Sequence, residues 1–134
     1  MNNSYAVDMM SYLYDEGDRD FILFGEILGM VSYDRDDQPF SKSDERRMFD
    51  ALKLVDFLVQ LGDFCVGHTQ RRPDDSFVDN VYGQGFEGFR ADASEMFFRD
   101  GIDGINLNSG LWLKKVKSGK PCPEIPGAIK GLFA

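Results

Sequence analysis

The sequence is poor in the residues that thiol and metal chemistry require. Its 134 residues include two cysteines, Cys65 and Cys122, and one histidine, His68. Two cysteines do not make a disulfide framework, and the sequence leaves open whether they pair with each other. Zinc sites commonly use closely spaced ligands such as C-x-x-C, and no such pair occurs. We therefore expect no metal, no cofactor and reduced thiols.

Long apolar runs are also missing. The longest candidate, residues 21–31 (FILFGEILGMV), is interrupted by Glu26 and two glycines, whereas a membrane-spanning helix needs about 20 apolar residues. The first eighteen residues lack the basic segment and apolar core of a secretory signal. These features predict a cytoplasmic protein that has no membrane partner.

Negative charge is abundant and unevenly placed. The net charge is −8, and residues 1–63 hold fourteen acidic and six basic residues, so the whole excess lies in the first half. Such a charge repels nucleic acid and attracts basic proteins. We expect a basic protein partner and no nucleic-acid partner.

Hydrophobic spacing predicts helices in the first half of the chain and mainly strands in the second half. Residues 1–62 show helical periodicity. The first expected helix covers residues 4–15 with Asn3 or Ser4 as N-cap, and the second is capped by Asp20 and runs to about Ser32. The third runs from Asp44 to about Leu61, between Ser43 as N-cap and Gly62. Residues 63–134 are richer in glycine and β-branched residues, and the expected strands are Phe64–Thr69, Phe77–Tyr82 and Leu111–Lys117.

The remaining segments of the second half are predicted from their turn and capping residues. Asp92 and Glu95 resemble a capping box, which predicts a helix from Asp92 to Gly101. The tail, residues 121–134, is expected to be extended and packed through its apolar side chains, Ile125, Ile129, Leu132 and Phe133. The sequence thus predicts one α+β domain over residues 1–134, with N-terminal helices packed on a small C-terminal, mainly antiparallel sheet.

Two segments resemble ligand-binding motifs but lack other features that those motifs require. The glycines of YGQGFEG, residues 82–88, match the dinucleotide fingerprint, but no series of strand–helix units follows them. We interpret this segment as a mobile loop that carries aromatic residues. The aspartates of YDRDDQP, residues 33–39, lack the glycine that a calcium loop needs at its sixth position, where Pro39 stands.

The stretch FCVGHTQRR, residues 64–72, places Cys65 three residues before His68. On a strand, residues three apart point to opposite faces, so the thiol and the imidazole cannot form a direct pair. We expect Cys65 in the core and His68 at the rim, and no enzymatic activity. A thiol-dependent enzyme that uses Cys65 or Cys122 remains an alternative, as does an adaptor that self-associates through Gly25 and Gly29.

Two acidic runs, YDEGDRD and YDRDDQP, and the helix-to-strand passage DALKLVDFLVQLGDFCVG give the chain a recognisable build. In this build it resembles the small acidic immunity proteins of contact-dependent growth inhibition and similar polymorphic toxin systems of bacteria. The resemblance implies a cytoplasmic, non-enzymatic inhibitor that binds a toxin domain, often a basic nuclease. It supplies no site residue by motif.

We predict that the partner contacts the two acidic runs and the aromatic residues beside them. Aromatic anchors inside an acidic field would provide affinity, and Tyr14, Tyr33 and Phe40 are the candidates. The predicted partner-binding residues are Asp15, Glu16, Asp18, Asp20, Tyr33, Asp34, Asp36, Asp37 and Phe40. The partner's identity and the oligomeric state do not follow from the sequence.

Overall fold

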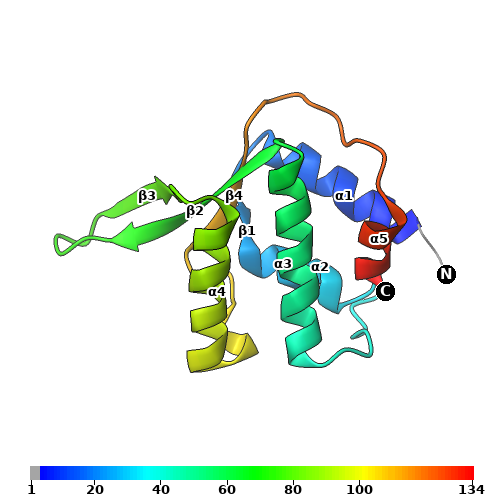
Figure 1. The fold of residues 1–134 in the computed structure, drawn as a ribbon, viewed down its shortest axis with the longest axis horizontal. Helices are drawn as coiled ribbons and strands as arrows, with labels where there is room; N and C mark the ends of the chain where they lie inside the picture. The colour runs from blue at the N-terminus through cyan, green and yellow to red at the C-terminus, as the bar shows by residue number, and fades with distance from the viewer. Residues whose placement is uncertain (1–3) are drawn as a thin grey trace.

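The computed structural model describes residues 4–134, which form five α-helices, two 3₁₀ helices and a four-stranded sheet. In chain order the elements are α1 (Ser4–Gly17), β1 (Ile22–Leu23), α2 (Phe24–Ser32), α3 (Asp44–Gln60), β2 (Phe64–Arg71), β3 (Phe77–Val81), α4 (Phe86–Asp100), η1 (Ile102–Gly104), β4 (Leu111–Lys115), α5 (Gly127–Lys130) and η2 (Gly131–Phe133). The α+β class is confirmed. Figure 1 shows the β2–β3 hairpin projecting beyond the helices on one side, with α1 and α5 on the other.

Every strand pair in the sheet is antiparallel, in the order β1-β4-β2-β3. Side chains alternate between the two faces. Phe64 and Val66 are buried on the inner face, where the Phe64 ring meets Tyr14 of α1 edge to face at 5.3 Å. On the outer face, Trp112 lies against Gly67 and stacks on Phe21 at 4.3 Å. The helices therefore stabilise the inner face, and Trp112 with its neighbours covers part of the outer one.

The longest helix, α3, begins and ends as the sequence predicts. The Ser43 hydroxyl accepts a hydrogen bond from Arg46 N at 3.1 Å, which satisfies a backbone donor of the first turn. Gly62 takes a left-handed conformation with φ of 78° just past the helix. The predicted N-cap of α1, Asn3 or the side chain of Ser4, lies outside the residues described.

The predicted role of Asp20 as N-cap of the second helix is wrong, because the N-cap of α2 is Leu23. The Asp20 carboxylate accepts a hydrogen bond from the next backbone amide, Phe21 N, at 2.7 Å. Ile22 and Leu23 then pair with β4 as a short strand, and α2 begins only at Phe24. Pairing with β4 buries Ile22 completely, which a purely local helical pattern does not reveal.

The predicted start of α4 at Asp92 is also wrong, because α4 begins six residues earlier, at Phe86. The glycine-rich segment interpreted as a mobile loop therefore supplies the N-cap, Gly85, and the first turn of this helix. A side chain at Gly88 would approach the Tyr82 ring to 2.9 Å, so glycine permits close packing there. Asp92 therefore lies inside the helix rather than at its N-cap, and its carboxylate accepts a hydrogen bond from the Tyr82 hydroxyl at 2.6 Å.

The end of the chain is helical over residues 127–133 rather than extended throughout. Its predicted packing is nevertheless observed, since the four apolar side chains are buried: Ile125, Ile129, Leu132 and Phe133. Phe133 meets the Tyr5 ring of α1 edge to face at 6.3 Å. The C-terminus thus packs against the first helix.

Gly25 and Gly29, the two glycines considered for self-association, do not form one surface of close packing in the part of the chain that is described. A side chain at Gly25 would come within 2.8 Å of the Asn106 backbone, so Gly25 packs against the loop before β4. Nothing lies within 4 Å of a Cβ placed at Gly29. The two glycines therefore meet different surroundings.

Candidate functional site

The first feature of the candidate site is the segment between α2 and α3, residues 33–40, which we call the acidic loop. One carboxylate oxygen of Asp34 accepts hydrogen bonds from Asp36 N at 2.8 Å and Gln38 N at 3.0 Å. Asp34 N in turn donates to the Gln38 carbonyl at 2.9 Å. Asp37 has a left-handed φ of 58°, which aspartate tolerates better than most residues. These contacts fix the backbone of the loop.

The tip of the acidic loop presents carboxylates to solvent. Asp36 and Asp37 are exposed, and neither side chain has a hydrogen bond or ion pair with residues 4–134. Tyr33 is 39% exposed beside them, whereas Phe40 is half-buried. Of the predicted loop residues, Asp34 therefore stabilises the loop, while Asp36, Asp37 and Tyr33 are accessible to a partner.

The base of the acidic loop is closed by backbone contacts and by α1. Phe40 N donates to the Ser32 carbonyl at 2.8 Å, and an isolated β-bridge joins Tyr33 to Pro39. From α1, the Tyr5 hydroxyl donates to the Tyr33 carbonyl at 2.9 Å. The Tyr5 ring also meets the Phe40 ring edge to face at 6.4 Å. Both ends of the loop are thus held by packed groups.

The electrostatic surroundings of Tyr5 favour its donor form. Burial, and then the negative charge of Asp34, raise the pKa of the Tyr5 hydroxyl, so it remains protonated at neutral pH. Arg35 lies over the same ring at 5.4 Å and forms an ion pair with Asp8 at 3.0 Å. Tyr5 and Asp8 of α1 therefore both contact the acidic loop, through Tyr33 and Arg35.

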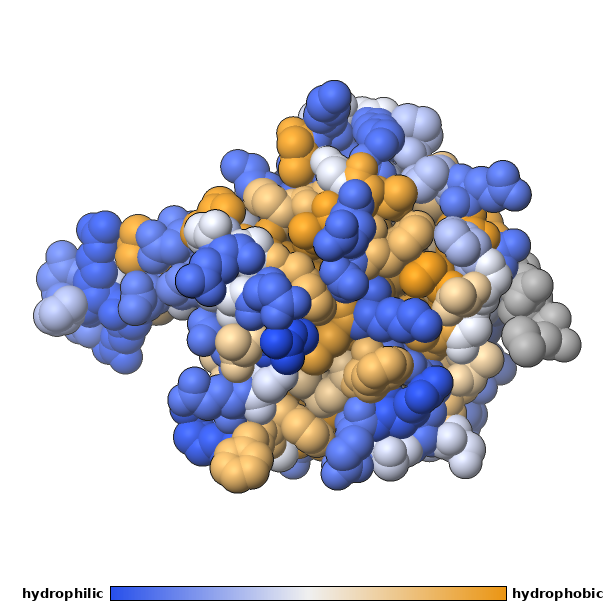
Figure 2. Space-filling model, in the orientation of Figure 1, coloured by the Kyte–Doolittle hydropathy of each residue, from blue (hydrophilic) through white to orange (hydrophobic). Residues whose placement is uncertain are grey.

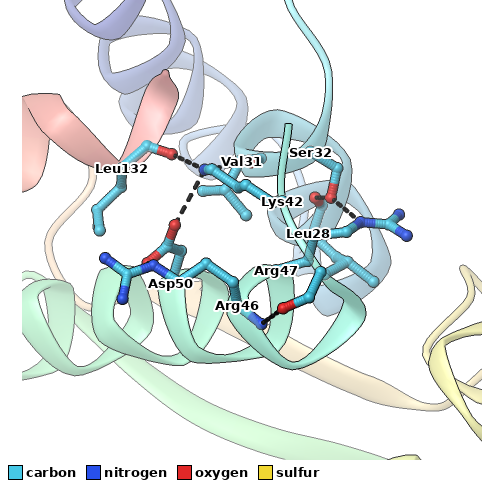
Figure 3. A network of polar contacts seen from close by, with 9 residues as sticks. Leu28, Val31, Ser32, Lys42, Arg46, Arg47, Asp50 and Leu132 are labelled. Atoms are coloured by element: carbon cyan, nitrogen blue, oxygen red, sulfur yellow. Dashed lines mark hydrogen bonds and ion pairs between the residues drawn. The ribbon is translucent and has the colours of Figure 1, made fainter. Parts of the chain in front are cut away.

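A buried polar network lies beneath the loop (Figure 3). The ammonium of Lys42 forms an ion pair with Asp50 at 2.9 Å and donates to the carbonyls of Val31 and Leu132, each at 2.7 Å. The side chains of Lys42 and Asp50 are only 7% and 3% exposed. The second Asp50 oxygen has Arg46 Nε 3.2 Å away, without hydrogen-bond geometry. Lys42 thereby links α2, α3 and the C-terminus.

Ser32 makes a second connection in the same network (Figure 3). Its hydroxyl donates to the Leu28 carbonyl at 2.5 Å and accepts from Arg47 Nε at 2.8 Å. The Arg47 guanidinium also lies 5.7 Å from the centre of the Tyr33 ring. The residue before the loop and its exposed aromatic residue are therefore both positioned by α3.

The second predicted cluster, residues 15–20, lies at the opposite end of α1 from the acidic loop. We call it the acidic turn. A helix of the length of α1 spans about 20 Å, so the two clusters do not form one continuous patch. The acidic turn borders a polar hollow of about 330 Å³ together with Lys114 and Lys115 of β4. These lysines make this surface less uniformly negative than the sequence suggests.

The side chains of the acidic turn have different roles. Asp18 accepts hydrogen bonds from the Lys115 ammonium and from Gly119 N, both at 2.8 Å, and the lysine in particular lowers the pKa of this carboxylate. Glu16 forms an ion pair with Arg19 at 2.8 Å. Only the remaining two predicted acids of the turn, Asp15 and Asp20, are exposed without an ion pair to residues 4–134.

Tyr14, predicted as an aromatic anchor, is only 1% exposed and cannot meet a partner without rearrangement. Its hydroxyl donates to the buried carboxylate of Asp63 at 2.5 Å, and Lys120 pairs with the other oxygen. Burial alone would raise the pKa of Asp63, but the hydrogen bonds from Lys120 and Tyr14 outweigh it and lower the pKa. Tyr14 is therefore part of the structural core.

Lys115 of β4 is buried, and this was not predicted although the sequence contains a signal for it. Leu111, Leu113 and Lys115 alternate along the strand, which places Lys115 on the inner face. Its ammonium donates to the Tyr14 carbonyl at 2.9 Å and to the Lys120 carbonyl at 2.7 Å. It thus connects α1 to the segment that follows β4.

Cys65 and His68 both lie on β2 and face opposite sides of the sheet, as predicted. Cys65 is half-buried on the outer face, beside Lys114, so its predicted place in the core is wrong. His68 is on the inner face, where its ring packs on Tyr82 at 4.8 Å. Cys122 lies elsewhere, and burial together with Asp63 raises the pKa of its thiol.

Hydrophobic side chains gather over α3 and beside it (Figure 2). There α3 and α4 border an open groove of about 400 Å³ that contains Phe49, Leu52 and Phe86. Among residues 4–134, no three His, Cys, Asp or Glu side chains lie where they could jointly hold a metal ion. None of the helices described combines the length and apolar character needed to cross a membrane.

Comparisons with known proteins identify no relative of this chain. No protein family, no curated protein sequence and no solved structure matches it.

Proposed function

We propose that this chain binds a basic protein domain and neutralises it, as a small acidic immunity protein does for its cognate toxin, with a nuclease as the expected toxin class. The observation that supports this is the acidic loop. Asp36 and Asp37 are exposed at its tip, while Asp34 fixes its backbone. The loop is thus an ordered negative surface before any partner arrives.

Two physical effects connect this geometry to inhibition. Opposite charge accelerates encounter, and steered association reaches about 10⁸ M⁻¹s⁻¹ at low salt. Speed matters because an inhibitor must capture a toxin before the toxin acts. An ordered loop also loses little conformational entropy when it binds. The hydrogen bonds to Asp34 and the contact of Tyr5 with Tyr33 supply this order, and the Lys42–Asp50 pair stabilises the helices on which the loop rests.

The test is to mix the chain with any candidate toxin domain encoded beside its gene and to measure association by stopped-flow fluorescence. We expect a tight complex, loss of toxin activity, and an association rate that falls roughly tenfold or more between 0.05 and 0.5 M salt. A mixture that forms no complex, or a complex in which the toxin remains active, would contradict the proposal.

The contribution of the loop is tested by Asp36→Asn combined with Asp37→Asn. Asparagine removes the charge and still tolerates the left-handed conformation at position 37. The matched control is Glu95→Gln with Glu124→Gln, which removes two exposed charges elsewhere. We expect the loop variant to associate a few-fold more slowly than the control. Equal slowing by both pairs would mean that only the net charge matters.

Neither alternative gains support from the geometry. A raised pKa leaves less of the Cys122 thiol in its reactive thiolate form at neutral pH, which weighs against a thiol enzyme. Gly25 packs against the loop at Asn106, which weighs against an adaptor that pairs through the Gly25 and Gly29 face. Protein-partner binding is therefore the function we favour.

A further inference from the structure

The strand β3 has one edge without a neighbouring strand. It is the last strand in the order β1-β4-β2-β3 and pairs with β2 alone among the strands described. The hairpin that β3 forms with β2 projects away from the helices (Figure 1). An unpaired edge strand offers backbone donors and acceptors to any extended segment of suitable sequence.

The hydrogen bonds to β2 identify which backbone groups point outward. At one end of the hairpin Arg72 N donates to the Ser76 carbonyl at 2.7 Å, and at the other Tyr82 N donates to the Val66 carbonyl at 3.0 Å. In an antiparallel pair, only every second residue exchanges hydrogen bonds with the partner strand. The even-numbered residues of β3 therefore face β2. The amides and carbonyls that face the open edge belong to the other three: Phe77, Asp79 and Val81.

The side chains of these three residues form an apolar–acidic–apolar row on the outer face. Phe77 is 68% exposed and Val81 is 59% exposed. Between them, the Asp79 carboxylate accepts a hydrogen bond from the Thr69 hydroxyl at 2.5 Å. The Thr69 oxygen also accepts from the Trp112 indole at 3.1 Å, so the position of Asp79 is fixed from below.

Charge makes a second copy of this chain a poor occupant of the edge. In the symmetric antiparallel pairing that uses all three outward residues, Phe77 would face Val81 of the other copy and Asp79 would face its own counterpart. Like charges directly opposite each other destabilise a strand pair. A basic residue in that position would instead pair with Asp79. The acidic residue therefore disfavours self-pairing and favours a basic strand.

We propose that the open edge of β3 binds an extended segment of a basic protein partner by strand addition. On the face that joins the outer face of this sheet, the segment presents a Lys or Arg between two apolar residues. Its backbone pairs with Phe77, Asp79 and Val81, its basic residue lies opposite Asp79, and its apolar residues cover Phe77 and Val81. The proposal rests on the proposed function only for the partner's basic character, because strand addition is tested without the toxin.

The probe is a capped seven-residue peptide of alternating threonine and valine with a central lysine (TVTKTVT), titrated into the ¹⁵N-labelled full chain. We expect saturable chemical-shift changes at the amides of Phe77, Asp79 and Val81, which also become protected from hydrogen exchange. The amides of Val78 and Asn80 already face β2 and should change less. The matched peptide with glutamate in place of lysine should bind more weakly.

Variants of the edge separate backbone pairing from side-chain contact. Val81→Pro removes an outward amide without removing a hydrogen bond to β2, and proline is tolerated on edge strands. Val81→Thr keeps that amide and is its control. We expect the proline variant to lose peptide binding and the threonine variant to retain it. Asp79→Asn keeps an acceptor for Thr69 and should weaken binding by about two- to fivefold.

Four results would overturn the inference: shifts confined to the acidic loop, equal binding of the lysine and glutamate peptides, undiminished binding to Val81→Pro, or a dimer in sedimentation that Val81→Pro abolishes. The last result would assign the edge to a second copy of the chain. Peptide binding without any toxin complex would refute the proposed function and leave strand addition intact. A toxin complex whose affinity is unaffected by Val81→Pro would refute strand addition and leave the proposed function intact.

Discussion

The buried ion pair beneath the acidic loop makes a quantitative prediction about stability. Replacing Lys42 with methionine keeps an apolar stem of similar length and removes the ammonium. The carbonyls of Val31 and Leu132 and one oxygen of Asp50 then lose their partner (Figure 3). Because Asp50 is 3% exposed, water cannot replace the lost contact without rearrangement.

The expected cost follows from the burial of the charge that remains. Breaking a buried ion pair by removing one partner costs about 3–5 kcal/mol. Arg46 Nε still lies 3.2 Å from the second oxygen of Asp50 and reduces this penalty. We therefore expect Lys42→Met to lower the free energy of unfolding by about 3 kcal/mol. Combining it with Asp50→Leu removes the unpaired charge and should recover part of that loss.

The assay is urea unfolding followed by the fluorescence of Trp112, the only tryptophan. With a denaturant slope of about 2 kcal/mol per molar, the midpoint should fall by about 1–2 M. Lys53→Met, at an exposed position of α3, the helix that carries Asp50, is the control and should change stability by less than about 0.5 kcal/mol. Equal effects of the two lysine substitutions, or no recovery in the double variant, would refute this account of the network.

Two further predictions concern the sheet and the buried carboxylate. In Gly67→Ala, the new methyl group overlaps the Trp112 indole and comes within 2.6 Å of the Asn80 carbonyl, so we expect a loss of about 1–3 kcal/mol and altered tryptophan emission. Gly29→Ala adds the same group to a helix with open space around it and should instead stabilise the protein by up to about 1 kcal/mol; matching effects would contradict both assignments. The lowered pKa of Asp63 means that its stabilising contribution is present above the pKa of the unfolded chain, near 4, and is lost as pH falls through the lower folded value. Asp63→Asn should therefore be less stable than the parent at pH 7, with a difference that shrinks toward pH 3 in urea unfolding, and a difference independent of pH would exclude this linkage.

The sequence alone determined the features that depend on neighbouring residues along the chain. Apolar spacing, the Ser43 cap and Gly62 define α3, because helix periodicity and capping are local properties. Strand alternation separates Cys65 from His68 for the same reason. The distribution of charge, with its excess in residues 1–63, is a property of composition and is also fixed by the sequence.

Tertiary structure decided what depends on contacts between distant segments. The pairing of Ile22 with Leu113 turned a predicted helix start into a strand. The start of α4 at Phe86 placed Asp92 inside the helix, where its carboxylate accepts a hydrogen bond from the Tyr82 hydroxyl. The fold also buries Tyr14, whose hydroxyl donates a hydrogen bond to the carboxylate of Asp63, a residue 49 positions away in the chain. Such contacts have no local pattern.

The same reason explains the division of the predicted binding residues into two clusters. In the sequence the two acidic runs are equivalent stretches of exposed charge. In the structure one carboxylate of the acidic turn, Asp18, is already paired with Lys115 of β4, which lies 97 residues away in the chain. The acidic loop instead keeps Asp36 and Asp37 exposed above a buried network. The sequence thus determined how much negative charge the chain carries, and only the folded arrangement decided which of those charges remain available to a partner.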